Sequence, residues 1–220
     1  DNVLYPVAGE IIAEVSGMSW EDFVTTRILE PAGMRGTDIR LSHPDSVPNA
    51  AMTHGRVEGV VRAVTPYLGD AVNPAGGIFS NANDMAKWVM VQLDSGRVAG
   101  GGRVFGGSVT TQLWKPVTPM PFGDPPPELE PQRQHFLYYA LGLRVGDYRG
   151  ERLIAHSGGL PGYLSKVSFL PERKAGVVVL TNQESGQAFD AITYHVLDHL
   201  MDAPAWDWLG GRAPVKERGA

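Results

Sequence analysis

Four consecutive residues, His156, Ser157, Gly158 and Gly159, stand between two runs of strand-forming residues. Successive side chains of a strand point to opposite faces, so His156 cannot readily act as a base for Ser157, which is a poor nucleophile candidate. The pattern suits substrate binding better, because bare glycine backbone lets a substrate approach the N–H groups. Such groups can stabilise an oxyanion in acyl transfer, and Gly159 is the natural donor. Taken alone, the pattern favours a structural histidine in a hairpin.

His195 and His199 form a second group that could do chemistry. They lie four residues apart in a predicted helix, a spacing that lets both face one metal ion. Position 196 is valine, where a zinc peptidase would carry its general base, and no third ligand follows at a usual spacing. We therefore expect two ordinary helix histidines, with no metal and no other cofactor.

Composition excludes several classes of function. The 220 residues contain no cysteine, which removes disulfides, thiolate zinc sites and a cysteine nucleophile. The net charge is −5 and the 19 lysines and arginines are dispersed, so no nucleic-acid partner is expected. Apolar runs fall short of the roughly 18 residues of a membrane span. No phosphate loop, dinucleotide fingerprint or Gly-x-Ser-x-Gly elbow occurs.

Four helices must help to position these residues. They are predicted from apolar side chains at helical spacing and from residues that cap helix ends. The predicted helices cover residues 3–16 up to Gly17, the stretch from Ser19 to Glu30-Pro31, the stretch from Ser80 or Asn81 to Gly96, and residues 187–202.

Four strands are predicted from short runs separated by turn signals, and their even spacing favours an antiparallel meander. The runs are LYYALGLRV (137–145), RLIAHS (152–157), YLSKVSFL (163–170) and GVVVLTN (176–182). Poor periodicity predicts irregular structure with short turns over 35–73, and glycine or proline enrichment predicts loops over 98–107 and 120–132. The order of these elements indicates an α+β fold, with one domain over 1–203 and a tail or linker over 204–220.

Three blocks of sequence resemble one superfamily, the serine β-lactamase-like hydrolases, which includes penicillin-binding proteins, class C β-lactamases, family VIII esterases and D-aminopeptidase-like enzymes. NVLYPVAGEIIAEVSGMSWEDFVTTRILEPAGM (2–34) resembles the helix pair that follows the family's Tyr-x-Asn motif. NPAGGIFSNANDMAKWVMVQLDSG (73–96) resembles its Pro-Ala-Gly-Gly turn and following helix. HSGGLPGYLSKVSFLPERKAGVVVLTN (156–182) resembles its Lys-Thr-Gly strand and the next two strands, in a His-x-Gly form.

The resemblance implies an antiparallel sheet flanked by helices, beside a mostly helical region, with the active site between them. In that plan the serine of a Ser-x-x-Lys motif forms an acyl-enzyme. Asn2 matches the asparagine of Tyr-x-Asn and would orient the substrate and the catalytic pair by hydrogen bonding. His156, Ser157 and Gly158 match the third motif, which binds substrate, and the N–H of Gly159 would hold the oxyanion.

The sequence departs from the family at its start. No Ser-x-x-Lys occurs, and the tyrosine of Tyr-x-Asn would precede Asp1. The resemblance therefore implies the C-terminal portion of a serine hydrolase, incomplete at its N-terminus and unable to form an acyl-enzyme alone. We expect association with the missing N-terminal portion or with another copy of the chain, because a sheet edge and an apolar face would otherwise be exposed.

Position 156 bears on the substrate. Lysine there would give a permanent cation for a carboxylate, whereas a histidine with an ordinary pKa near 6.5 is mostly neutral at pH 7. We expect a small-molecule ester or a D-amino-acid amide or peptide as substrate, with β-lactam hydrolysis as a side activity. The alternative is a non-catalytic binding or assembly module for a peptide or cell-wall ligand. The amino-acid sequence alone does not indicate a cellular compartment. The resemblance implies a periplasmic or secreted protein.

Overall fold

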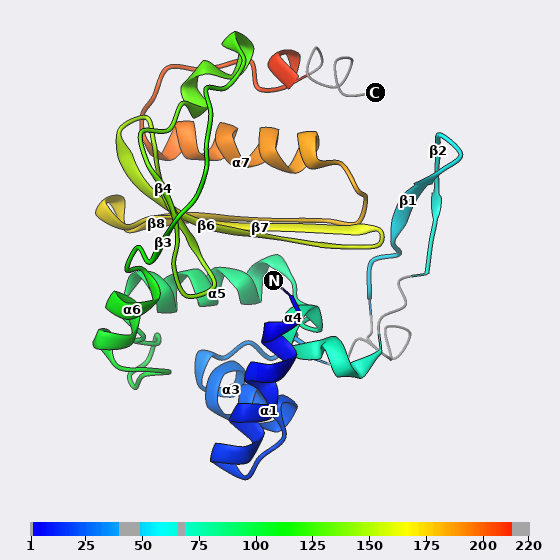
Figure 1. Ribbon diagram of the computed structural model, residues 1–220, viewed down its shortest axis with the longest axis vertical. Helices are drawn as coiled ribbons and strands as arrows, with labels where there is room; N and C mark the ends of the chain where they lie inside the picture. Colours follow the sequence, from blue (N-terminus) through cyan, green and yellow to red (C-terminus); the bar gives the residue numbers. More distant parts are fainter. Residues whose placement is uncertain (1, 40–48, 66–68, 213–220) are drawn as a thin grey trace. The chain divides into compact units, whose positions relative to one another are not determined.

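The computed structural model describes residues 2–39, 49–65 and 69–212, and its contacts divide the chain into two compact units. Unit 1 comprises residues 1–105, 158–163 and 182–184. Unit 2 comprises residues 106–157, 164–181 and 185–220. Antiparallel sheets and helices make up the chain (Figure 1), which confirms the predicted α+β class.

The predicted helix pair opens unit 1. Helix α1 (Leu4–Ser16) ends at Gly17, which has a left-handed φ of 69°. Helix α2 (Trp20–Val24) begins at Ser19, whose hydroxyl accepts a hydrogen bond from the amide of Asp22 at 3.0 Å, as the capping pattern predicts.

The predicted end of the second helix at Pro31 is wrong. A π-helical stretch (Thr25–Leu29) follows α2 and leads into helix α3 (Glu30–Ala32), which ends at Gly33. Pro31 is the second residue of α3, and the turn directly before it is π-helical rather than α-helical.

A hairpin of strands β1 (His54–Val57) and β2 (Val60–Ala63) occupies part of the stretch predicted as irregular. Its turn residues, Glu58 and Gly59, both have positive φ values, 50° and 80°, as a type I′ turn requires. Residues 40–48 and 66–68 of the same stretch lie outside the described residues.

Three helical segments complete unit 1. They are a 3₁₀ turn (Asp70–Val72), helix α4 (Asn73–Gly76) and helix α5 (Ala82–Leu93). The side chain of Asn81 caps α5 by accepting from the amide of Asp84 at 3.0 Å. Of the two predicted caps, Asn81 is therefore the one that is used. The core of unit 1 consists of Val24, Leu29, Ala32, Met34, Ile39 and Val91, with Trp20 and Trp88 packed against it.

Helix α1 presents an apolar stripe to solvent. Its other side packs closely: a Cβ added at Gly9 would lie 2.5 Å from Pro74 Cγ. The stripe residues recur at helical spacing and are between 50% and 83% exposed; they are Val3, Leu4, Val7, Ile11 and Val15. An exposed apolar row of this length is typical of an interaction surface.

Unit 2 is built on a six-stranded sheet with the order β3-β4-β5-β6-β7-β8. The strands are β3 (Thr118–Pro119), β4 (Leu137–Tyr139), β5 (Arg144–Tyr148), β6 (Glu151–Leu160), β7 (Tyr163–Leu170) and β8 (Ala175–Thr181). The predicted meander is confirmed, but the predicted strand 137–145 is two strands. A turn at Leu141-Gly142, with a φ of 76° at Gly142, separates β4 from β5.

Helix α7 (Gly186–Leu200) covers one face of this sheet (Figure 1), close to its predicted range. Its side chains share a core with Leu153, Leu170, Val177 and Val179 of the sheet. Unit 2 also contains helix α6 (Gly107–Leu113) and a 3₁₀ helix (Pro127–Gln132), neither of which was predicted.

The buried carboxylate of Asp198, on α7, links this helix by hydrogen bonds to strand β5 and to the C-terminal segment of unit 2. The hydroxyl of Tyr148 and the indole Nε1 of Trp208 donate to it, the latter at 2.8 Å. Arg149 donates to both oxygens, at 2.8 and 3.2 Å. Burial, together with the adjacent carboxylate, raises the pKa of Tyr148. Trp208 lies in the predicted tail but is only 3% exposed; the boundary at residue 203 stays a prediction.

The tip of the β6–β7 hairpin belongs to unit 1 and is anchored there. The hydroxyl of Tyr163 donates to the carbonyl of Ala51 at 2.5 Å, and its ring meets Phe79 edge-on with centroids 5.9 Å apart. The amide of Gly162 donates to Glu184 Oε1 at 2.7 Å. These contacts fix the turn that ends β6.

Replacing Gly162 with alanine is expected to destabilise unit 1 by more than about 1 kcal/mol. Gly162 has a φ of 79°, and an added Cβ would lie 2.4 Å from Thr53 Cβ. Urea denaturation measures the effect. Gly69→Ala is the matched control, because Gly69 has a φ of −70° and no atom of the described residues, apart from its neighbours in the chain, lies within 4 Å of its Cβ position. Equal midpoints for the two variants would contradict the prediction.

Candidate active site

The second half of β6 extends beyond its neighbour β5. The antiparallel register of the two strands runs from Tyr148↔Glu151 to Arg144↔Ala155 and stops there, because the chain turns at Leu141-Gly142. Residues 156–160 of β6 therefore have no partner in β5. An unpaired strand edge offers backbone N–H and C=O groups to a ligand.

Strand alternation decides which amides face this edge. The two-residue turn Arg149-Gly150, with φ values of 49° and 81°, makes Tyr148↔Glu151 a hydrogen-bonded pair, so that Arg144↔Ala155 is one too. The amide of Ala155 then points toward β5, and the amides of Ser157 and Gly159 point to the same side. The oxyanion donor predicted at Gly159 therefore lies on the bare edge.

His156 is half-buried on β6. Its Nε2 lies 3.5 Å from the hydroxyl of Tyr139, at the outer limit of a hydrogen bond, and the two rings meet edge-on with centroids 6.4 Å apart. Burial lowers the pKa of His156, the positive charge of Arg144 lowers it further, and a hydrogen bond to the backbone of Ser157 acts in the opposite direction. The imidazole is therefore mostly neutral at pH 7.

The remaining predicted site residues are exposed. Ser157, Gly158 and Gly159 lie on β6 directly after His156, and Ser157 and His156 point to opposite faces of the strand. Asn2 lies in the turn before α1, where its carbonyl accepts from the amide of Tyr5 at 3.3 Å. Asn2 belongs to unit 1 and His156 to unit 2, so their cooperation stays a prediction.

Two residues near His156 were not predicted from the sequence as part of the site: Tyr139 and Arg144. Both were assigned to one continuous strand, which hid the turn that brings β4 and β5 together in the register Tyr139↔Arg144. The glycine at position 142, inside an apolar run, was the signal for that turn.

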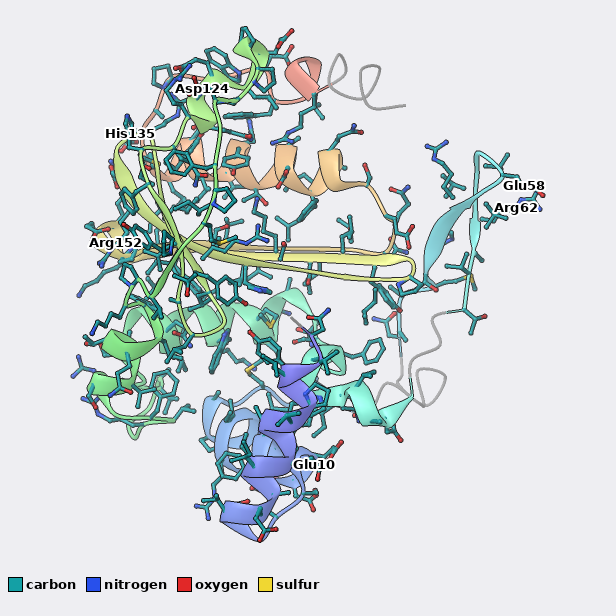
Figure 2. The ribbon with its side chains drawn as sticks, viewed as in Figure 1. Glu10, Glu58, Arg62, Asp124, His135 and Arg152 are labelled. Carbon is teal, nitrogen blue, oxygen red and sulfur yellow. The ribbon has the colours of Figure 1, made fainter. Side chains whose placement is uncertain are left out.

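Strand β4 is held in place at its start by a buried carboxylate of β5. Asp147 accepts hydrogen bonds from the amides of His135 and Phe136, at 2.7 and 3.3 Å, and lies 2.6 Å from Nδ1 of His135 (labelled in Figure 2). Burial alone would raise the pKa of Asp147, but these hydrogen bonds prevail and lower it. The charged carboxylate thus fixes the strand that carries Tyr139.

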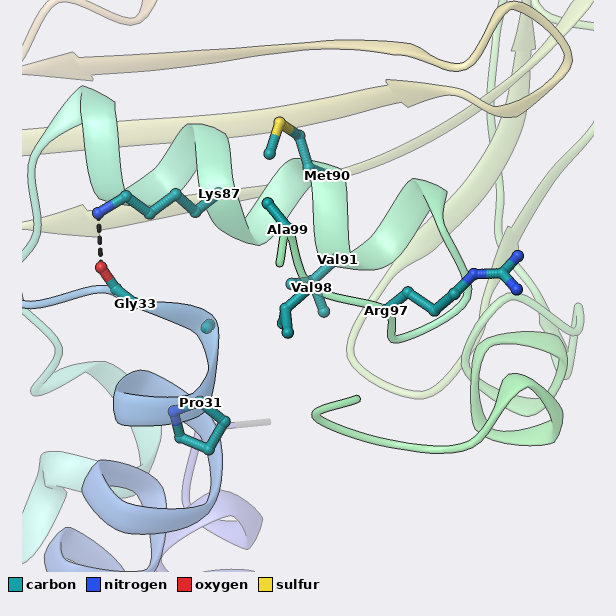
Figure 3. Close-up of a pocket in the computed structure, with 9 residues that line it drawn as sticks. Pro31, Gly33, Lys87, Met90, Val91, Arg97, Val98 and Ala99 are labelled. Atoms are coloured by element: carbon teal, nitrogen blue, oxygen red, sulfur yellow. Dashed lines mark hydrogen bonds between the residues drawn. The ribbon is translucent and has the colours of Figure 1, made fainter. Parts of the chain in front are cut away.

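Unit 1 has a separate hollow of about 380 Å³, lined by residues of α3, α5 and the segment 97–99 (Figure 3). Its walls are mostly apolar, with Met90 and Val98 among them. Lys87 is neutralised there, donating to Asp84 at 2.7 Å and to the carbonyl of Gly33 at 2.5 Å. No residue predicted for catalysis lines it.

His195 and His199 lie on α7 as predicted. Within residues 2–39, 49–65 and 69–212, no group of three or more histidine, aspartate or glutamate side chains is placed to hold a metal ion. In the same residues, no helix has the length and apolar character needed to cross a bilayer.

The sheet and helices define the fold of penicillin-binding proteins. The octameric penicillin-binding protein homologue from Pyrococcus abyssi superimposes with a TM-score of 0.77 at 25% identity, over 92% of this chain and 42% of its own. The sequence model of the Beta-lactamase family matches residues 1–201. The chain belongs to this family, as the three blocks of sequence predicted.

Two curated relatives match nearly the whole chain. The unguisins hydrolase of Aspergillus violaceofuscus is 25% identical over 224 residues, and penicillin-binding protein 4* of Bacillus subtilis is 26% identical over 220 residues. Each match covers 94% of this chain. The chain spans 39% of the length of the first relative and 44% of the second.

Proposed function

We propose that residues 1–220 form the substrate-binding part of a serine hydrolase that acts on esters, β-lactams or D-amino-acid amides and peptides through an acyl-enzyme. The bare edge of β6 beyond Ala155 is the observation that carries the proposal. The amide of Gly159 on this edge stabilises the oxyanion, and His156, Ser157 and Gly158 bind the substrate beside it. Asn2 orients the substrate and the catalytic pair.

The nucleophile comes from polypeptide outside these residues, because the sequence contains no Ser-x-x-Lys. An oxyanion donor without an activated serine cannot form an acyl-enzyme. Residues 1–220 alone are therefore expected to be inactive. The names of the relatives, a hydrolase and a penicillin-binding protein, support the reaction class.

The protonation state of the His156 imidazole supports a preference among substrates. Its lowered pKa leaves little positive charge at the position where lysine would bind a carboxylate. Esters and D-amino-acid amides are therefore the preferred substrates, and β-lactam hydrolysis is a side activity.

Covalent labelling tests this proposal. A fluorophosphonate or penicillin probe is expected to label one serine of the protein that includes the Ser-x-x-Lys segment, and no serine of residues 1–220 alone. Mass spectrometry of the digested adduct locates the label. An adduct on Ser157, or on any other serine within 1–220, would reject the assignment of roles.

A non-catalytic binding or assembly module is the second candidate, and the absence of Ser-x-x-Lys from the sequence favours it. In that case the bare edge of β6 holds a peptide or cell-wall ligand without turnover. The same labelling separates the candidates, because this module gives no adduct even with the complete protein. A periplasmic or secreted location, which the family resemblance implies, stays a prediction.

A further inference from the structure

Two cations of unit 2 share one carboxylate on the face of the sheet that α7 covers. Lys166 of β7 donates to Oδ1 of Asp190 on α7 at 2.5 Å. Arg212, in the 3₁₀ turn Gly210–Arg212, donates to Oδ2 of Asp190 through Nη1 at 3.2 Å. The side chains of the lysine and the arginine are only 12% and 10% exposed. These three groups together carry one net positive charge, and buried charge is costly unless it is balanced.

Aromatic rings hold both cations in place. Lys166 Nζ lies 4.7 Å from the ring centroid of Tyr194 and 5.5 Å from that of Phe189. The guanidinium carbon of Arg212 lies 5.7 Å from the same tyrosine ring, which packs against Trp208 with centroids 5.1 Å apart. Cations held over ring faces have little freedom to lose when a ligand binds. The cluster is therefore preorganised.

One edge of the Arg212 guanidinium is buried without an acceptor. Nε and Nη2 form this edge, and their N–H groups point in parallel directions, the geometry that matches the two oxygens of a carboxylate. Both atoms are buried, and neither has a hydrogen-bond partner among the described residues. Native structures leave few buried donors unpaired, because each one costs the free energy of its lost hydration. The edge is therefore suited to receive an oxyanion.

We propose that the Nε–Nη2 edge of Arg212 binds a carboxylate, with Lys166 as a second cation of the same site. A single negative charge balances the cluster of two cations and Asp190, which favours a carboxylate over a phosphate dianion. The carboxylate belongs either to a free small acid or to an acidic side chain of polypeptide outside residues 1–220.

The sheet separates this site from the imidazole of His156. Leu153 of β6 packs in the core that α7 covers, so strand alternation places His156 on the opposite face. Lys166 lies on the α7 face, because it reaches Asp190. Binding at Arg212 is therefore independent of the role proposed for His156, and the failure of either proposal leaves the other standing.

Formate is the probe for this site, with formamide as its neutral counterpart of similar size. Residues 1–220 are titrated with each compound at constant ionic strength, while NMR follows the Nε–H resonance of Arg212, assigned through its side-chain carbons. Formate is expected to shift this resonance along a saturable curve, and formamide is expected to leave it in place. No shift with formate, or an equal shift with formamide, would overturn the inference.

Arg212→Lys is the decisive variant, because lysine keeps the positive charge and loses the paired N–H edge. The urea midpoint of the unaltered chain should rise with formate, since a ligand that binds only the folded state stabilises it. The dissociation constant obtained from this rise is expected to increase about tenfold in Arg212→Lys, as for the loss of one charge-assisted hydrogen bond. Equal dissociation constants for the variant and the unaltered chain would overturn the inference.

Arg152→Lys is the matched control. Arg152 (labelled in Figure 2) is exposed and already pairs with Glu172 at 2.8 Å, so its replacement should leave the response to formate unchanged. If Arg212→Lys does not fold, the NMR titration of the unaltered chain decides the question alone.

The complete protein, which includes the Ser-x-x-Lys segment, identifies the source of the carboxylate. If its Arg212 resonance responds to formate as it does in residues 1–220, the site takes a free acid. If the resonance has already moved in the direction that formate causes and no longer responds, an acidic side chain of the additional polypeptide occupies the site. A resonance that neither has moved nor responds would overturn the inference.

Discussion

Gly159→Pro is expected to reduce ester turnover by the complete protein by about 10²- to 10³-fold, the usual effect of removing one oxyanion donor. Proline has no N–H, and the amide of residue 159 is the one that strand alternation directs to the bare edge of β6. Initial rates with a chromogenic ester measure kcat, and the effect should fall on kcat more than on KM because the oxyanion exists only during reaction.

Gly159→Ala is the matched control, because alanine keeps the N–H and tolerates an extended backbone. Its turnover should lie well above that of Gly159→Pro, and the urea midpoints of the two variants separate a catalytic effect from a folding defect. If both variants lose the same activity while remaining folded, side-chain bulk rather than the amide is responsible, and the oxyanion role is rejected.

Asp198→Asn is expected to lower the free energy of unfolding of unit 2 by about 3 kcal/mol, because breaking a buried ion pair leaves an uncompensated charge. Asp198 is 4% exposed and accepts hydrogen bonds from Tyr148, Arg149 and Trp208. The neutral amide leaves the Arg149 guanidinium without its counter-charge and offers fewer acceptors to the phenol and the indole.

Asp202→Asn provides the comparison for this effect. Asp202 follows α7, its side chain is 96% exposed, and it pairs only loosely with Arg173, at 3.9 Å. Exposed pairs of this kind contribute about 0 to 1 kcal/mol. Urea unfolding followed by circular dichroism should therefore give clearly different midpoints, and equal midpoints would show that the Asp198 cluster adds nothing to stability.

The helices were largely predictable from the sequence, because their signals are local. Ser19 and Asn81 cap the helices that follow them, and Gly17 ends α1. The hairpin β1–β2 was missed because its turn uses Glu58-Gly59, and glutamate rarely adopts the positive φ that a type I′ turn needs. Its strands are also short, and most of their residues are exposed, so no alternating apolar pattern marks them.

Of the candidate site, only the residues on strand β6 were predictable from the sequence. The motif at 156–159 identified β6 and the amide of Gly159, whereas Tyr139 and Arg144 reach this strand through pairings between residues up to 17 positions apart. The register between these strands depends on where the chain turns. The turn at Leu141-Gly142 was not predicted, so β4 and β5 were predicted as one strand. Long-range pairing is thus the part that local patterns do not determine.

The apolar row on α1 has a practical consequence for handling the chain. Attraction between apolar surfaces strengthens on warming near room temperature, because the hydration of such surfaces has a large heat capacity. Solutions of residues 1–220 should therefore turn cloudy when heated at concentrations that stay clear in the cold. Replacing Ile11, near the middle of the row, with glutamate should raise the clouding temperature.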